Sequence, residues 1–183
     1  MKTFKIAVIV GSLRKESLNL KMAKALAELA PESLSLKIVD LAGLPMFNED
    51  LEANPPNEWI TFKEQISAAD GVLFLTPEYN RSIPGVLKNA IDVGSRPYGQ
   101  SAWDGKPGAV MSLSPGNISG FGANHHLRQA LTFLNVPAMA QPEAYIGGAA
   151  DLFDDTGALT NDSTKGFLKS FMQAFAKWVQ TNA

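Results

Sequence analysis

The distribution of apolar and polar residues along the chain predicts a regular alternation of strands and helices. Apolar runs of strand length lie at roughly 4–10, 34–39, 72–76 and 108–113, with a broken fifth strand at 137–140 and 144–146. Apolar residues recur at helical spacing in the segments between and after these runs, at roughly 17–29, 57–69, 83–91, 127–134 and 164–180. This alternation is typical of an α/β fold with a doubly wound parallel sheet.

The order of the strands follows from the same pattern. Five strands are expected to form one sheet in the flavodoxin-like order 2-1-3-4-5, with helices on both faces. Residues 1–183 then form a single domain. Loops rich in polar residues, glycine and proline follow the first, third and fourth strands, at 11–19, 77–84 and 113–122. These strands are neighbours in this order, so we expect the three loops to form one crevice at the carboxyl edge of the sheet.

The loop after the first strand has the composition of a phosphate-binding loop. Ser12, Ser17 and Asn19 supply neutral donors, and Arg14 supplies a charged planar one. The helix that follows directs its backbone N–H groups and its positive dipole end at this loop. With one glycine and no Gly-Lys-Ser/Thr, the loop is neither a dinucleotide fingerprint nor a P-loop, which favours a mononucleotide. The alternative is a plain helix start, with Ser17 as N-cap and Arg14 in solvent.

Composition narrows the possible chemistry. A net charge of −2 without a basic cluster argues against a nucleic-acid partner, and no apolar run is long enough for a membrane span. There is no cysteine, and the two histidines, His125 and His126, are adjacent. A metal or thiol centre is therefore hard to assemble, and redox chemistry would require a bound organic cofactor. The N-terminal segment has no signal-peptide pattern, so a cytoplasmic protein is expected.

Two longer motifs follow the first and third strands. The first is Gly11-Ser12-x-Arg14-x-x-Ser17-x-Asn19. The second begins Thr76-Pro77-Glu78-Tyr79-Asn80 and continues through Pro84-Gly85 to Asn89-Ala90-Ile91-Asp92. Together they resemble the NAD(P)H-dependent FMN reductases, a flavodoxin-like family that includes bacterial quinone and chromate reductases. The resemblance extends over most of the chain, through Gly105-Lys106-Pro107 and Leu127-Arg128-Gln129 to Pro142-Glu143.

The resemblance implies bound FMN, with NADPH or NADH as electron donor and a small-molecule acceptor. Quinones are the expected acceptors, and chromate, azo dyes and nitroaromatic compounds are incidental ones. The cofactor-binding residues that it implies are Ser12, Arg14, Ser17, Leu18, Asn19, Pro77, Glu78, Tyr79, Asn80, Ser114 and Gly116. The first loop would hold the phosphate, the second would lie at the isoalloxazine edge, and the third would close the pyrimidine end. No metal and no catalytic side chain is implied, and similar proteins are homodimers or homotetramers.

Two other functions stay open at this point. One is a flavin reductase that uses FMN as a released substrate. The other is a flavodoxin-like electron carrier without an NAD(P)H site. A phosphoacceptor receiver domain is set aside, because the first and third strands end in Val10-Gly11-Ser12 and Thr76-Pro77 rather than in acidic residues.

Several single residues also have two interpretations. Glu78 is either a partly solvated turn carboxylate or a group at the flavin or at an interface. Arg128 and Glu143 either pair across subunits or act within one chain. The connection 44–56 is either a functional or interface segment or a solvated loop. Ser82 is expected to be the N-cap of the third helix, with Pro84 in the first turn.

Overall fold

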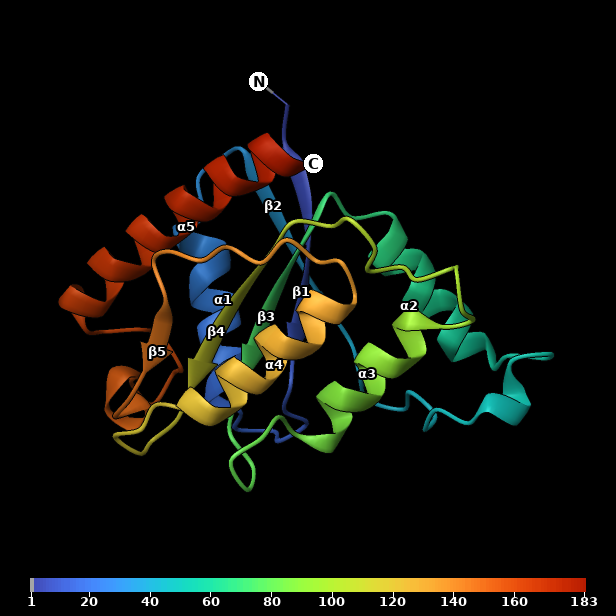
Figure 1. Cartoon of the computed structure of the whole chain (residues 1–183). Helices are drawn as coiled ribbons and strands as arrows, with labels where there is room; N and C mark the ends of the chain where they lie inside the picture. The colour runs from blue at the N-terminus through green and yellow to red at the C-terminus, as the bar shows by residue number, and fades with distance from the viewer. Residues whose placement is uncertain (1) are drawn as a thin grey trace.

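Five parallel strands form one sheet in the order β2-β1-β3-β4-β5 (Figure 1). The structure is a computed structural model and describes residues 2–183. The strands are β1 (Phe4–Val10), β2 (Leu34–Val39), β3 (Gly71–Thr76), β4 (Gly108–Leu113) and β5 (Ala144–Ile146). The predicted flavodoxin-like order is confirmed, and the change of direction lies between β1 and β3.

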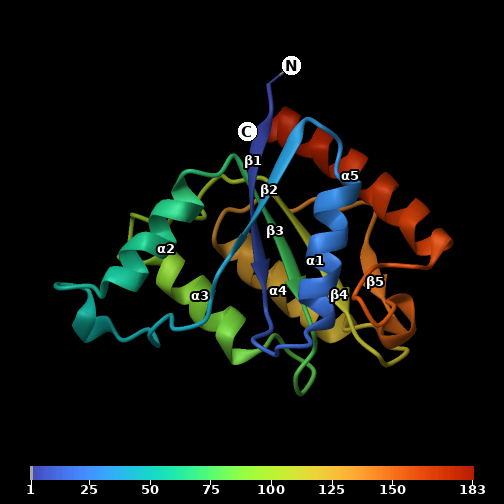
Figure 2. The ribbon, with the colours of Figure 1, turned by 180° about the vertical axis from the view of Figure 1, so that it is seen from behind.

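Helices cover both faces of this sheet. They are α1 (Leu18–Leu29), α2 (Asn57–Ser67), α3 (Gly85–Ser95), α4 (Phe121–Phe133) and α5 (Asp162–Asn182), with short 3₁₀ turns η1 (Glu49–Leu51) and η2 (Ala149–Leu152). Helices α1 and α5 pack on one face, and α2, α3 and α4 pack on the other (Figures 1 and 2). None of the helices in residues 2–183 combines the length and apolar character needed to cross a bilayer.

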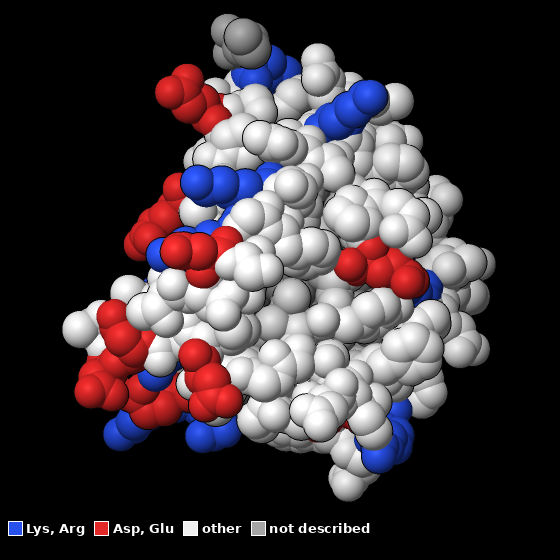
Figure 3. Space-filling model, turned by 90° about the vertical axis from the view of Figure 1, so that its left-hand side faces the viewer, with Lys and Arg blue, Asp and Glu red and all other residues white. Residues whose placement is uncertain are grey.

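The sheet has two edge strands, β2 and β5. β5 is short, and the segment before it adds only an isolated bridge between Gly108 and Ala138, so the predicted interruption of the fifth strand is confirmed. On the β5 side of the molecule, most charged side chains lie along one half of the face, and both signs are present there (Figure 3).

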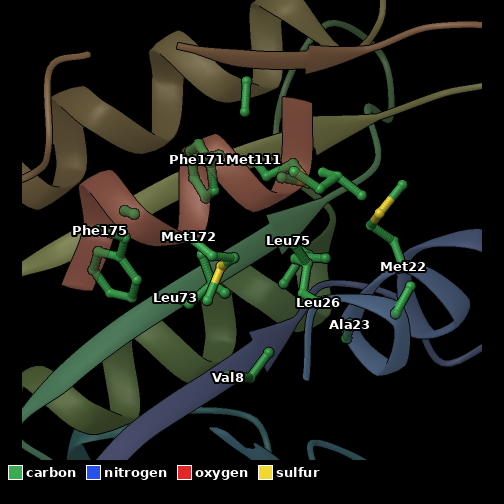
Figure 4. Close-up of a cluster of buried hydrophobic side chains, with 14 of the residues drawn as sticks. Val8, Met22, Ala23, Leu26, Leu73, Leu75, Met111, Phe171, Met172 and Phe175 are labelled. Carbon is green, nitrogen blue, oxygen red and sulfur yellow. The ribbon is translucent and has the colours of Figure 1, made fainter. Parts of the chain in front are cut away.

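The sheet separates two hydrophobic clusters. Leu73 and Leu75 face α1 and α5, where Phe171 packs among them (Figure 4). The residue between them, Phe74, faces the opposite side and packs against Trp103, with ring centroids 5.6 Å apart. Both faces of the central strands are therefore apolar, which explains why their sequences are continuous hydrophobic runs.

The start of α3 differs from the prediction. The helix begins at Gly85 with Pro84 at the N-cap position, and no side chain caps it. Ser82 cannot serve as the cap because its backbone exchanges two hydrogen bonds with Tyr79, at 2.9 and 3.0 Å. Its hydroxyl lies instead 3.0 Å from Nδ1 of His126 on α4. The expectation that Ser82 caps this helix is therefore wrong.

The long connection after β2 is held against α2 and α3. Asn89 of α3 is buried, and its Oδ1 accepts a hydrogen bond from Phe47 N at 2.8 Å. Its Nδ2 donates to the carbonyls of Leu44 and Pro45 at 3.3 and 3.1 Å. The indole of Trp59 donates to the same Pro45 carbonyl at 2.9 Å. This part of the connection is thus anchored by side-chain hydrogen bonds rather than lying free in solvent.

The contact between Gly94 and Trp103 provides a test of this packing. Trp103 is fully buried, and its indole N–H donates to the Ile91 carbonyl at 3.0 Å. A Cβ at Gly94 would lie 2.4 Å from Nε1 of Trp103. We expect Gly94→Ala to lower the free energy of unfolding by about 1–3 kcal/mol through overpacking, measured by urea denaturation.

The control is Gly166→Ala on α5, where a Cβ would meet no atom within 4 Å. Because alanine favours a helix over glycine by up to about 1 kcal/mol, this variant should be unchanged or more stable. If both substitutions had the same effect, the close contact at Gly94 would not be the cause.

Candidate active site

The ends of β1, β3 and β4 lie next to one another at the lower edge of the sheet in Figure 1. In the strand register, Val10 lies opposite Leu75, and Thr76 lies opposite Ser112. Each of these positions is at or next to the last residue of its strand, so the three following loops leave the sheet at one level. The predicted convergence of these loops is confirmed.

The backbone of the first loop is rich in unused donors. Among the described residues, no backbone carbonyl accepts a hydrogen bond from the N–H groups of residues 12–19. These residues lead into the N-terminus of α1, where the helix dipole is positive. A stretch of free amides at such a place binds an anion.

Ser17 supports both interpretations that the sequence left open. It is the N-cap of α1, and its Oγ accepts a hydrogen bond from Leu20 N at 3.2 Å. The plain helix-cap interpretation is therefore correct for this residue. A hydroxyl that accepts one hydrogen bond can still donate its own proton, so the cap leaves Ser17 free to act as a donor to an anion.

Asn19 carries an orphaned polar atom. Its side chain is buried, at 4% exposure, and its Oδ1 has no hydrogen-bond partner within residues 2–183. An unsatisfied buried acceptor is costly, so this position suits a donor from outside the chain. The neighbouring Arg14 is exposed, and the carboxylate of Glu16 pairs with Lys21 at 3.0 Å instead. The loop thus offers many donors and one buried acceptor, which suits a phosphate ester that also carries hydroxyl groups.

The turn after β3 has an unusual backbone. Asn80 and Arg81 have positive φ angles of 51° and 65°, and Tyr79 and Ser82 close the turn by exchanging hydrogen bonds. Asparagine adopts this conformation readily, whereas arginine does so at a cost. Tyr79 is 49% exposed, so it is not a core residue. Pro77 adds a carbonyl that accepts from the buried Thr76 hydroxyl at 2.7 Å.

Glu78 does not project freely into solvent. Its side chain is 11% exposed, and Oε1 accepts a hydrogen bond from Arg81 Nη1 at 3.0 Å. Oε2 accepts from the backbone N–H of Ala123, in the first turn of α4, at 3.1 Å. Glu78 is therefore a partly exposed turn carboxylate, as one of the two interpretations held, but both of its oxygens have partners. No sequence pattern could have indicated the contact with Ala123, because the partner of the carboxylate is a backbone amide.

The loop after β4 is folded on itself and on the exit of β5. Ser114 Oγ accepts from Gly116 N at 3.1 Å, and the backbone of Ser114 bonds to Ile146 and Ala149. A Cβ at Gly147 would lie 2.6 Å from the Ser119 hydroxyl, so the two loops approach closely. Ser114 and Gly116 are thus held in a compact turn at the same edge as the other two loops.

A buried polar network joins α4 to β4 and β5. The sequence analysis did not predict this network. Asn124 is fully buried, and its Nδ2 donates to Ser112 Oγ and to the Ala144 carbonyl, both at 3.3 Å. Its Oδ1 accepts from Arg128 Nε at 2.9 Å, and Arg128 Nη1 donates to the Met139 carbonyl at 3.0 Å. Arg128 therefore has a role within its own chain. Polar residues inside an apolar helix stripe were the available signal.

Glu143 belongs to a separate cluster at the β5 edge. The hydroxyl of Tyr145 donates to Glu143 Oε1 at 2.9 Å and lies 3.0 Å from His125 Nε2. Partial burial, followed by this bond to the carboxylate, raises the pKa of Tyr145 above its ordinary value. The ring of Phe121 packs against His125, with centroids 4.2 Å apart. Within residues 2–183 no hydrogen bond joins this cluster to Arg128, so Glu143 and Arg128 belong to different networks of the same chain.

Comparison with known proteins gives a consistent result. The profile of a family described as NADPH-dependent FMN reductase matches residues 4–151. A quinone reductase of Pseudomonas putida is 64% identical over 182 residues, which cover 99% of this chain and 97% of that protein. A 2-hydroxy-1,4-benzoquinone reductase of a Burkholderia species is 48% identical and covers 96% of each chain. The solved structure of the flavoenzyme NAD(P)H:(acceptor) oxidoreductase of Paracoccus denitrificans has a TM-score of 0.93 at 43% identity, covering 98% of this chain and 99% of that one.

Substitutions of Ser17 and Arg14 in the first loop should have different effects on the free energy of unfolding. Ser17→Ala removes the N-cap of α1, and we expect the free energy of unfolding to fall by about 1 kcal/mol. Arg14→Ala removes an exposed side chain and should change this free energy by less than about 0.5 kcal/mol. Both are measured by urea denaturation without added ligand, and equal losses would contradict the assigned cap.

Proposed function

The chain belongs to the NADPH-dependent FMN reductase family, and from this premise we propose that it is an FMN-dependent oxidoreductase that takes a hydride from NADPH or NADH and reduces quinones. The quinone reductases among its relatives support the choice of acceptor. The observation that carries the proposal is the first loop, which combines unused backbone amides with a buried Asn19 Oδ1 that has no partner within residues 2–183.

The residues of the first loop fit the polar end of FMN. The free amides of residues 12–19, the hydroxyls of Ser12 and Ser17 and the guanidinium of Arg14 would hold the phosphate. Asn19 Oδ1 would accept a hydrogen bond from a hydroxyl of the ribityl chain, which supplies the missing donor. Leu18 begins α1 between Ser17 and Asn19 and would contact the same part of the molecule.

The two other loops would flank the ring system. The turn from Pro77 to Asn80 and the loop from Ser114 to Gly116 follow the neighbouring strands β3 and β4 at the same edge of the sheet. When bound, FMN supplies the hydride chemistry. The chain contributes binding, orientation and fixed backbone dipoles, and no side chain is assigned as an acid, base or nucleophile. Chromate, azo dyes and nitroaromatic compounds are proposed only as incidental acceptors.

Purification and reduction test the proposal. We expect a yellow protein with about one FMN per chain. It should bleach when NADH or NADPH is added under nitrogen and regain its colour when a quinone follows. A colourless protein that turns over free FMN would favour a flavin reductase that releases its flavin. A yellow protein that neither pyridine nucleotide reduces would favour an electron carrier.

Arg14→Ala tests the phosphate site directly. We expect FMN binding to weaken by about 1.5–3 kcal/mol, the scale of a charged hydrogen bond. Lys15→Ala is the matched control, because it removes another exposed cation from the same loop. An unchanged FMN dissociation constant in Arg14→Ala, measured by fluorescence titration, would contradict the assigned role of the loop.

The proposal includes a homodimer or homotetramer in the cytoplasm, where reduced pyridine nucleotides are available. The support for self-association is a pair of exposed aromatic side chains, one at the end of α4 and one just after α3. Phe133 is 86% exposed and Tyr98 is 88% exposed. They line one hollow of about 660 Å³ together with Phe47 and Leu134. Exposed aromatic side chains gathered around a hollow are typical of protein interfaces.

Phe133→Asp should shift the protein toward the monomer, because it replaces an exposed aromatic side chain of this surface with a charge. The control is Ile60→Asp, which changes an exposed apolar residue on α2 that lines a different hollow. Sedimentation equilibrium measures both. A wild-type protein that is monomeric, or a Phe133→Asp variant with the wild-type mass, would contradict the proposed surface.

A further inference from the structure

Helix α4 begins without a cap of its own. Its N-cap residue is Gly120, with a φ angle of 73°. Glycine has no side chain that could accept a hydrogen bond from the first turn. The first turn contains no acidic residue. The N–H groups of a first helical turn need acceptors from elsewhere, and the helix dipole favours an anion there. Glu78, which follows β3, supplies both through the bond of its Oε2 to Ala123 N at 3.1 Å.

A missing side chain on α4 makes this contact possible. A Cβ at Gly122 would lie 2.9 Å from the Arg81 carbonyl oxygen and 3.0 Å from Glu78 Oε2. The first of these atoms belongs to the backbone, so it cannot rotate away as a flexible side chain could. Glycine at position 122 therefore lets the turn after β3 rest directly on the first turn of α4.

Two more contacts hold the same turn in place. Arg81, which has the unfavourable φ of 65°, donates to the other oxygen of Glu78 at 3.0 Å. Ser82 Oγ lies 3.0 Å from Nδ1 of His126, one turn further along α4. A left-handed conformation at a residue such as arginine persists only when its surroundings hold it there. Glu78 lies at the centre of these contacts because each of its oxygens has a partner.

Helix α4 is the direct continuation of the loop after β4, since Phe121 follows Gly120 in the chain. A group that fixes the turn after β3 to α4 therefore also fixes it relative to that loop. We propose that Glu78 is a positioning residue that joins the two loops flanking the flavin, so that the width of the slot is set before FMN binds. This inference rests on the proposed function, because it assigns these loops to an FMN site.

Loss of the Glu78 carboxylate should lower the population of molecules that can bind FMN. Without the carboxylate, the turn and the helix separate, and only a fraction of molecules keeps the arrangement that binds FMN. The apparent dissociation constant rises in inverse proportion to that fraction, so a fall to about a tenth weakens binding about tenfold. An amide at this position can still accept from Ala123 N–H, but it turns an N–H₂ group toward Arg81. Its effect should lie between those of the carboxylate and alanine.

The experiment compares Glu78→Ala and Glu78→Gln in two measurements. We expect the FMN dissociation constant to rise about tenfold in Glu78→Ala and less in Glu78→Gln, with a change in the visible circular dichroism of bound FMN. In flavin-free protein, the amide proton of Ala123 should exchange faster in Glu78→Ala. The control is Glu28→Gln, an exposed carboxylate on α1, which should match the wild type in both.

Gly122→Ala tests the same contact without changing a charge. It should weaken FMN binding as Glu78→Ala does, and the double variant should lose no more than the larger single loss, because both changes break one contact. Gly166→Ala is the control for the substitution itself.

The outcomes separate this inference from the proposed function. If the wild type binds no FMN, the proposed function fails, and the exchange of Ala123 still reports whether Glu78 holds α4. The inference is overturned if the wild type binds FMN and Glu78→Ala lowers only the unfolding stability, with FMN affinity and dichroism unchanged. Strictly additive losses in the double variant would overturn it as well.

Discussion

The register of the three central strands is the constraint on which the site depends. β1 bonds to β3 on one side and to β2 on the other, and β3 bonds in turn to β4. The chain leaves β1 toward α1 on one face and leaves β3 toward α3 on the other face. Because the two helices lie on opposite faces of the sheet, the exits of β1 and β3 form the switch point at which open α/β sheets bind their ligands.

The hydrogen-bond partners of the buried asparagines distinguish residues that support the fold from a candidate ligand-binding residue. Asn89 and Asn124 are buried, and both the oxygen and the nitrogen of each amide have partners in the chain. Asn19 is equally buried, but its Oδ1 has none within residues 2–183. The same contrast holds for backbone amides, which are unused along residues 12–19. A folded chain leaves such groups unsatisfied mainly where a ligand completes them.

The strained backbone of the turn after β3 lies at the same edge of the sheet as the first loop. Asn80 and Arg81 both adopt left-handed backbone conformations, and contacts with α4 add to the hydrogen bonds within the turn that hold them. Backbone strain at a binding edge indicates that the shape of this turn is kept for its function. In the proposed FMN site, the first loop would therefore provide the polar contacts, and the turn after β3 would provide a fixed boundary.

The local features of this protein follow from the order of its residues. Apolar periodicity identified all five strands and five helices, and the residue types of the first loop identified its donors, because both are properties of neighbouring residues. Tertiary structure alone decided which groups meet across the chain. Glu78 bonds to the amide of Ala123, Ser82 contacts His126 instead of capping α3, and Arg128 bonds to Asn124. A backbone amide is the same in every residue except proline, so no sequence pattern reveals which carboxylate will reach it.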